Sequence, residues 1–69
     1  MNPNNQTRSA VEPLLVDANT AARMLAISPR KLWELTDRGE ILCVRFGRML
    51  RYDPDDLRRA IEKHKANGS

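Results

Sequence analysis

The fold is decided by residues 17–39, which read DANTAARMLAISPRKLWELTDRG. Asp17 is suited to cap the start of a helix, with Thr20 at the third helical position. Four apolar residues follow at spacings of three and four, which places them on one helical face: Ala18, Ala21, Ala22 and Leu25. Because this face is mostly alanine, we expect another element to pack very close to it.

A second helix begins almost immediately after the first. Pro29 disfavours helical backbone at the residue before it, so the first helix must end near Leu25. Ser28 is a strong N-cap, and Pro29 takes the first helical position, where its missing N–H costs nothing. Gly39 is placed to end this helix. Two short helices separated by about three residues form a helix-turn-helix.

After Gly39 the apolar period changes from the helical value to two, which predicts a half-buried hairpin. Its apolar residues are Val44, Phe46, Leu50 and Tyr52, and they alternate with Arg45 and Arg51. The expected turn is Gly47-Arg48-Met49. If Val44 and Phe46 face the core, Arg45 and Arg51 face outward on the same side and Arg48 lies at the tip. We therefore expect a basic wing.

The last helix has the strongest signals. Asp53 is its N-cap, Pro54 is its first residue, and Asp55 and Asp56 lie at the positive end of the helix dipole. The expected inward face is Leu57, Ala60, Ile61 and His64. The predicted organisation is a disordered tail over residues 1–13, a domain over 14–66 and a frayed end over 67–69. The run from Leu14 to Val16 is either a brief strand or a plug into the core.

Composition and charge narrow the function classes. The chain has 69 residues and a net charge of +3, which fits one small domain. The segment from Arg23 to Arg51 holds seven basic residues against three acids, whereas the rest holds five against six. This distribution favours a polyanionic partner, of which nucleic acid is the commonest, although a small protein is often mildly basic by chance. No apolar run reaches the length of a membrane span, so we expect no membrane partner and a cytoplasmic, nucleoid-associated protein.

No catalytic or metal site is predicted. Cys43 is the single cysteine and has no clustered histidine, which argues against a metal site. His64 is the single histidine and is expected to be a cation at a helix end. Because the chain also has no nucleophile elbow and no phosphate-binding glycine loop, we predict no enzyme, no cofactor and no small-molecule substrate.

From Leu14 to Ile61 the chain resembles, without a gap, the small winged helix-turn-helix domain of excisionase-type DNA-binding proteins, which is related to the DNA-binding part of MerR-type regulators. The resemblance lies in Ala21–Leu25, Ser28–Trp33, Arg38–Ile41, Val44–Arg48, Arg51-Tyr52 and Asp55–Leu57. The chain departs from the family pattern at Ala26, Leu42 and Leu50, where the family often has Gly, Pro and an aromatic residue. Ala26 is compatible with the turn if it avoids positive φ.

The resemblance implies an α+β winged fold with three short helices and a two-stranded β-hairpin wing. It also implies that the second helix enters the major groove of double-stranded DNA, while the hairpin reaches a neighbouring minor groove or a run of phosphates. The expected DNA-binding residues are Ser28, Arg30, Lys31, Trp33, Glu34, Arg38, Arg45, Arg48, Arg51 and Arg23.

Most of these residues have a second interpretation. Arg30, Lys31 and Glu34 lie on the outer face if Leu32 and Leu35 point inward; Arg can pair with guanine and Glu with cytosine, but the face can also be merely solvated. Trp33 either donates its indole N–H to a phosphate or packs on the wing. Arg38 contacts phosphate or pairs with Glu34. The wing arginines bind phosphate or protect a strand edge. Arg58 and Arg59 are expected only to form part of the solvent-exposed face of the last helix.

Three roles remain open at this point. Two are DNA-binding roles: an excisionase-like recombination accessory factor, or a small transcriptional regulator. The third is a protein-interaction adaptor that kept the fold without binding DNA. Because a single module of this size buries a small interface, further copies on adjacent sites, or a recombinase, are possible partners. RNA is a poorer candidate, since the expected sheet has few aromatic residues on which bases could stack.

Overall fold

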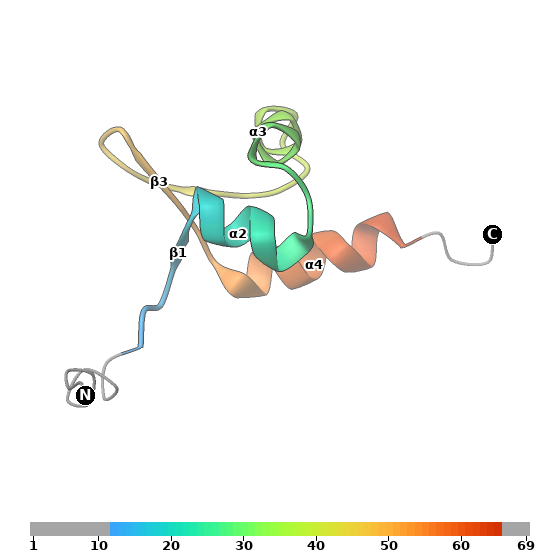
Figure 1. Ribbon diagram of the computed structural model, residues 1–69, viewed down its shortest axis with the longest axis horizontal. Coiled ribbons are helices and arrows are strands. Elements are labelled where there is room, and N and C mark those ends of the chain that lie inside the picture. The colour runs from blue at the N-terminus through green and yellow to red at the C-terminus, as the bar shows by residue number, and fades with distance from the viewer. Residues whose placement is uncertain (1–11, 66–69) are drawn as a thin grey trace.

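The computed structural model describes residues 12–65 (Figure 1). In chain order the elements are β1 (Val16–Asp17), α2 (Ala18–Leu25), α3 (Pro29–Asp37), β2 (Val44–Phe46), β3 (Met49–Tyr52) and α4 (Pro54–His64). Three helices and a small antiparallel sheet confirm the predicted α+β class. Most of the predicted N-terminal tail and the predicted C-terminal fray lie outside the described residues.

The sheet has three strands in the order β1-β3-β2, so the predicted two-stranded hairpin gains a third strand. In this added pairing Val16 lies opposite Tyr52, and Asp17 lies opposite Arg51. Of the run from Leu14 to Val16, only Val16 belongs to this strand, and Val16 also packs against the core, whereas Leu14 is 87% exposed.

Helix α2 begins and ends on local backbone signals. The Asp17 carboxylate accepts from the Thr20 N–H at 2.8 Å, as the capping prediction requires. At the other end the Ile27 N–H donates to the Ala22 carbonyl at 3.0 Å and the Ala26 N–H to the Arg23 carbonyl at 3.1 Å, which is a Schellman motif. The motif places Ala26 at φ 59° and ψ 40°. The condition under which alanine fits this turn without strain, a negative φ, is thus not met.

Helix α3 follows the predicted signals at both ends. The Ser28 hydroxyl oxygen accepts from the Lys31 N–H at 3.0 Å, and Pro29 opens the helix. A second Schellman motif ends it, with Gly39 at φ 77° and the Glu40 N–H donating to the Leu35 carbonyl at 2.9 Å. The same left-handed conformation is thus taken by glycine after α3 and by alanine after α2.

The core is small and lies between the helices and the base of the sheet. Its buried residues are Ala21, Ala22, Leu32, Ile41, Tyr52, Leu57 and Ala60. The alanines on α2 confirm the predicted close packing, and α4 contributes Leu57 and Ala60. The rest of the predicted α4 stripe is not buried, since Ile61 is 45% exposed and His64 is also exposed. The stripe runs past the end of the small core.

One side-chain contact fixes the sheet against α3. Thr36 donates its hydroxyl hydrogen to the Leu32 carbonyl at 2.8 Å. The hydroxyls of Thr36 and Tyr52 also lie 2.8 Å apart. Because the single hydroxyl hydrogen of Thr36 is already used, Tyr52 donates in this second bond. The base of the hairpin is thereby held at a set position relative to α3.

Residues 12–65 include no helix that is both long enough and apolar enough to cross a membrane.

Candidate nucleic-acid interface

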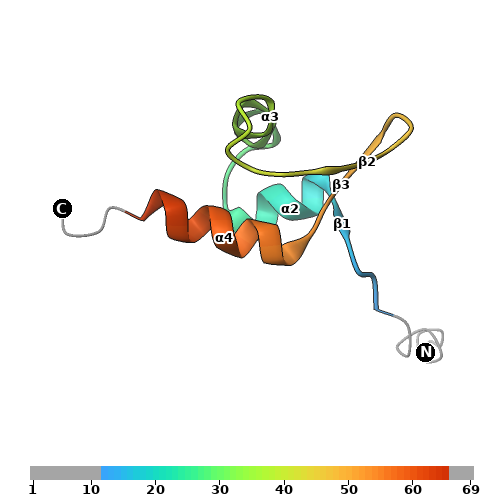
Figure 2. The ribbon, with the colours of Figure 1, turned by 180° about the vertical axis from the view of Figure 1, so that it is seen from behind.

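Helix α3 and the tip of the β2–β3 hairpin project from the same side of the molecule. Figure 1 shows both rising above α2 and α4, with α3 seen nearly end-on. The opposite view in Figure 2 gives the same arrangement. The residues of α3 and of the hairpin are therefore placed to meet one extended ligand.

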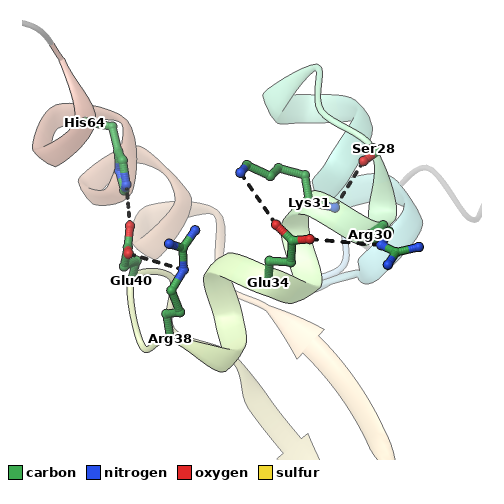
Figure 3. A network of polar contacts seen from close by, with 7 residues as sticks. All are labelled: Ser28, Arg30, Lys31, Glu34, Arg38, Glu40 and His64. Carbon is green, nitrogen blue, oxygen red and sulfur yellow. Dashed lines mark hydrogen bonds and ion pairs between the residues drawn. The ribbon is translucent and has the colours of Figure 1, made fainter.

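The outward face of α3 carries the residues predicted for it. Leu32 is buried and Leu35 half-buried, so Arg30, Lys31 and Glu34 point into solvent. Figure 3 shows the three side chains together. The Glu34 carboxylate lies 3.5 Å from the Lys31 ammonium and 4.0 Å from the Arg30 guanidinium. These exposed pairs are weak, so both cations remain able to exchange Glu34 for a phosphate or a base edge.

The α3 face is nevertheless close to neutral overall. Asp37, which the sequence analysis did not single out, is exposed and lies three residues after Glu34 on the same side of the helix. Two acids thus share this side of α3 with Arg30 and Lys31. A face that carries both positive and negative side chains is poorly suited to binding phosphates. It is suited to binding base edges, because these offer both hydrogen-bond donors and acceptors. Helical spacing from Arg30 was the signal that could have identified Asp37.

Trp33 lies on the exposed side of α3 with 47% of its surface accessible. Trp33 is therefore not one of the buried core residues. Its role in DNA contact stays a prediction.

The hairpin differs from the prediction in its turn. The turn has two residues, Gly47-Arg48, and Met49 already belongs to β3. Gly47 has φ 64°, and Arg48 is not at positive φ, as in a type II′ turn. A three-residue turn would have placed Phe46 opposite Leu50, whereas Phe46 pairs with Met49. This shift of one residue puts Val44 and Phe46 on the face opposite Leu50 and Tyr52, so the predicted inward set is wrong for Val44 and Phe46 only.

The observed register divides the hairpin arginines between two faces. Arg45 pairs with Leu50, and Arg51 pairs with Val44, so Arg45 and Arg51 lie on opposite faces rather than on one. Phe46 and Met49 share the face of Arg51 and are exposed, instead of facing the core. Leu50 and Tyr52 point toward the core face.

The three arginines also differ in how they are held. Arg45 and Arg48 are exposed, and neither has a carboxylate partner among residues 12–65. Arg51 is half-buried and donates to the Leu50 carbonyl at 2.8 Å, with Asp17 opposite it in β1. Edge protection fits Arg45, which lies on the edge strand β2, but not Arg51 on the central strand β3.

The remaining predicted cations lie around these two elements. Arg38 is the C-cap of α3, and its guanidinium lies 3.6 Å from the Glu40 carboxylate; the expected pair with Glu34 is not formed. Arg23 is exposed in the last turn of α2. By contrast, Arg58 and Arg59 are paired with Asp55 and Asp56 on α4 at 3.3 and 2.8 Å, in line with a solvating role.

A polar cluster joins the end of α3 to α4 (Figure 3). The two ring nitrogens of His64 lie 2.9 Å from the Ala60 carbonyl and 2.8 Å from the Glu40 carboxylate. The contact with the Ala60 carbonyl, followed by that with Glu40, raises the pKa of His64 above its ordinary value. The bond from His64 lowers the pKa of Glu40. With two acceptors around the ring, the protonated imidazole is the form that this cluster favours.

No group of three or more potential metal ligands occurs within residues 12–65. Cys43 is a half-buried free thiol in the loop before β2.

The comparison with protein families agrees with this architecture. The family described as "Helix-turn-helix domain" matches residues 15–65, and the chain belongs to that family. Searches of curated proteins and of solved structures found no match. Helix-turn-helix domains act by binding DNA and are typically not enzymes, so DNA binding is the function class of this chain.

Proposed function

We propose that this domain binds double-stranded DNA with α3 in the major groove and the β2–β3 hairpin on the backbone or in the adjacent minor groove. The observation that carries the proposal is that the hairpin projects on the same side of the molecule as α3 and carries exposed Arg45 and Arg48, which have no carboxylate partner among residues 12–65. By contrast, Arg58 and Arg59 on α4 are each paired with an aspartate.

The two elements have different tasks in this proposal. The hairpin carries no acid between Val44 and Tyr52, so it supplies phosphate contacts and most of the affinity. The α3 face mixes Arg30 and Lys31 with Glu34, so it reads base edges. Ser28, Trp33, Arg38 and Arg23 flank this face and complete the proposed contact set, while Arg51 mainly holds the hairpin backbone.

A salt titration tests the proposal. We would measure binding to a mixed-sequence duplex by fluorescence anisotropy for the wild type and for Arg45→Ala/Arg48→Ala. The control is Arg58→Ala/Arg59→Ala, which removes the same charge from paired arginines on α4. The plot of log K against log salt has a negative slope. For the hairpin variant this slope should be shallower than that of the wild type by about 2, at roughly 0.9 per lost phosphate contact. Equal slopes for the two variants would overturn the placement of the interface.

Within DNA binding we propose one of two roles: an excisionase-like accessory factor that directs a recombinase, or a small transcriptional regulator. A domain of this size buries only about 600–1,000 Å² on DNA, which supports cooperation with a recombinase or with further copies on adjacent sites. Footprinting on a DNA fragment with several selected sites tests this. Occupation should spread from one site to its neighbours as protein is added, and full affinity at a single isolated site contradicts it.

A further inference from the structure

The tip of the hairpin carries two exposed apolar side chains that the phosphate contacts do not use. Phe46 and Met49 are 54% and 51% exposed, and they pair directly across the two strands. They flank the Gly47-Arg48 turn, so they are the last paired residues before the end of the ribbon. Single exposed apolar residues are ordinary in proteins, but a cross-strand pair at a projecting tip forms a continuous apolar surface.

The core does not account for this pair. The opposite face of the hairpin holds Leu50 and buried Tyr52, and it is this face that packs on the helices. Half-buried Val44 is on the side of Phe46 and Met49 but lies at the base of the ribbon. Phe46 and Met49 therefore face away from the domain, and burying them requires a partner.

The surrounding charge indicates what kind of partner fits. Arg48 is in the turn itself, Arg51 shares the face of the apolar pair, and Arg45 lies on the other face of the same ribbon. No acid occurs between Val44 and Tyr52. An apolar surface beside arginines complements a ligand with phosphates at its edges and apolar surface between them. The minor groove of duplex DNA has phosphates at its rims, sugars along its walls, and apolar base faces that become accessible where a step is unstacked.

The width of the minor groove limits how the hairpin tip can enter it. The minor groove of B-DNA is about 6 Å wide, whereas two paired strands alone lie about 4.8 Å apart. The tip with its two large side chains therefore enters only if the groove opens. Apolar wedges that enter a base step in this way unstack it partly and bend the duplex.

Resting on the proposed function, we propose that Phe46 and Met49 form an apolar wedge that opens the minor groove and bends DNA, while the arginines around them hold the phosphates. The wedge favours flexible pyrimidine–purine steps, because these steps are deformed at the lowest energy. The hairpin thus contributes to sequence preference through DNA deformation as well as to affinity through charge.

The test uses a duplex that the wild-type protein selects from a random pool, labelled at both ends for energy transfer. The variant is Phe46→Ala/Met49→Ala. The control is Leu42→Ala/Ile61→Ala, which removes two exposed apolar side chains from the α4 side of the molecule. The wedge variant should bind at least about tenfold more weakly and bend the duplex less, with an unchanged salt slope because no charge is removed. The control should match the wild type in affinity and bending.

The outcomes separate this inference from the proposed function. If the wild type binds no duplex, both fail. If the wild type binds but the wedge variant bends DNA as well as it does, only the wedge is overturned. If sedimentation shows that the wedge variant loses self-association while keeping its DNA bending, the apolar pair is instead a contact between copies of the chain. Circular dichroism of each variant confirms that the fold is kept.

Discussion

Helices α3 and α4 begin in the same way but carry opposite charge patterns. Both have a side-chain N-cap followed by proline, Ser28-Pro29 in α3 and Asp53-Pro54 in α4. The first turn of α4 then holds Asp55 and Asp56, and its last turn holds Lys63 and His64, so both ends complement the helix dipole.

The charges of α3 oppose its dipole in the first turn, and at the other end the unfavourable Asp37 stands beside a favourable Arg38 at the C-cap. Its first turn holds Arg30 and Lys31 with no acid, and its last residue is Asp37. Each misplaced charge costs on the order of 0.3–1 kcal/mol of helix stability. The capping residues of α3 thus stabilise the helix, whereas the charges in its first turn destabilise it. The difference is explained if the α3 charges serve a ligand and those of α4 serve the fold.

The largest expected effect is on DNA binding through α3. Arg30→Gln/Lys31→Gln should weaken binding to a selected duplex by about tenfold or more, which is about 1.4 kcal/mol. The unfolding free energy should stay within about 0.5 kcal/mol of the wild type, because relief at the dipole offsets the lost pairs with Glu34. Anisotropy and urea unfolding on the same samples measure the two quantities. If Arg30→Gln/Lys31→Gln loses stability but still binds DNA, the charges of α3 serve the fold, and the contrast with α4 is refuted.

The end of α3 provides a change that affects only stability. Gly39 takes φ 77° with open space around its missing Cβ, so Gly39→Ala should lose about 1–2 kcal/mol from backbone strain alone. The reverse change after α2, Ala26→Gly, should gain about 0.5–1 kcal/mol, since the relief at φ 59° exceeds the added freedom of the unfolded chain. Thermal unfolding measures the stability of both variants. Stabilisation by Gly39→Ala would refute the left-handed conformation at Gly39.

The counterpart experiment on α4 should show the opposite pattern from α3. Asp55→Asn/Asp56→Asn removes both favourable first-turn charges and the pairs with Arg58 and Arg59. We expect a loss of about 1 kcal/mol in unfolding free energy. DNA binding should not weaken, because the change makes the protein more positive. Weaker binding at full stability would place part of the interface on α4.

The smallest expected effect is a pH dependence at the contact between His64 and Glu40. The pKa of His64 is raised in the folded state, so its contribution is complete below the ordinary value of 6.5 and is lost as pH rises through the raised pKa. The pKa of Glu40 is lowered, so its contribution is lost as pH falls below the ordinary 4.5. The difference in Tm between wild type and His64→Gln should therefore be greater at pH 5.5 than at pH 8. The nearby charge of Lys63 opposes protonation of His64 and therefore keeps this pH-dependent difference in Tm small.

The helix ends were predictable because their causes are local. Asp17, Ser28 and Asp53 each bond a backbone N–H two or three residues away, so the sequence alone contains both partners. The outward placement of Arg30, Lys31 and Glu34 followed from the same helical spacing.

The hairpin was not predictable to the same degree, because its faces depend on the length of one turn. A two-residue turn in place of a three-residue turn put Phe46 on the outer face and Arg45 on the face of Leu50 and Tyr52, which separated Arg45 from Arg51. The third strand β1 and the pairing of Arg38 with Glu40 depend on contacts that residue spacing does not encode. Ala26 shows that the Schellman motif at the end of α2 can hold alanine in a conformation that favours glycine.

The central claim is that DNA lies against α3 and the hairpin and not against α4. The most direct test is a titration of the uniformly ¹⁵N-labelled protein with a selected duplex, followed by amide and indole NMR shifts. We predict the largest changes at the Trp33 indole, in the first turns of α3 and around Gly47-Arg48, with small changes at Arg58 and Arg59. Changes concentrated on α4, with α3 and the hairpin unaffected, would contradict the account.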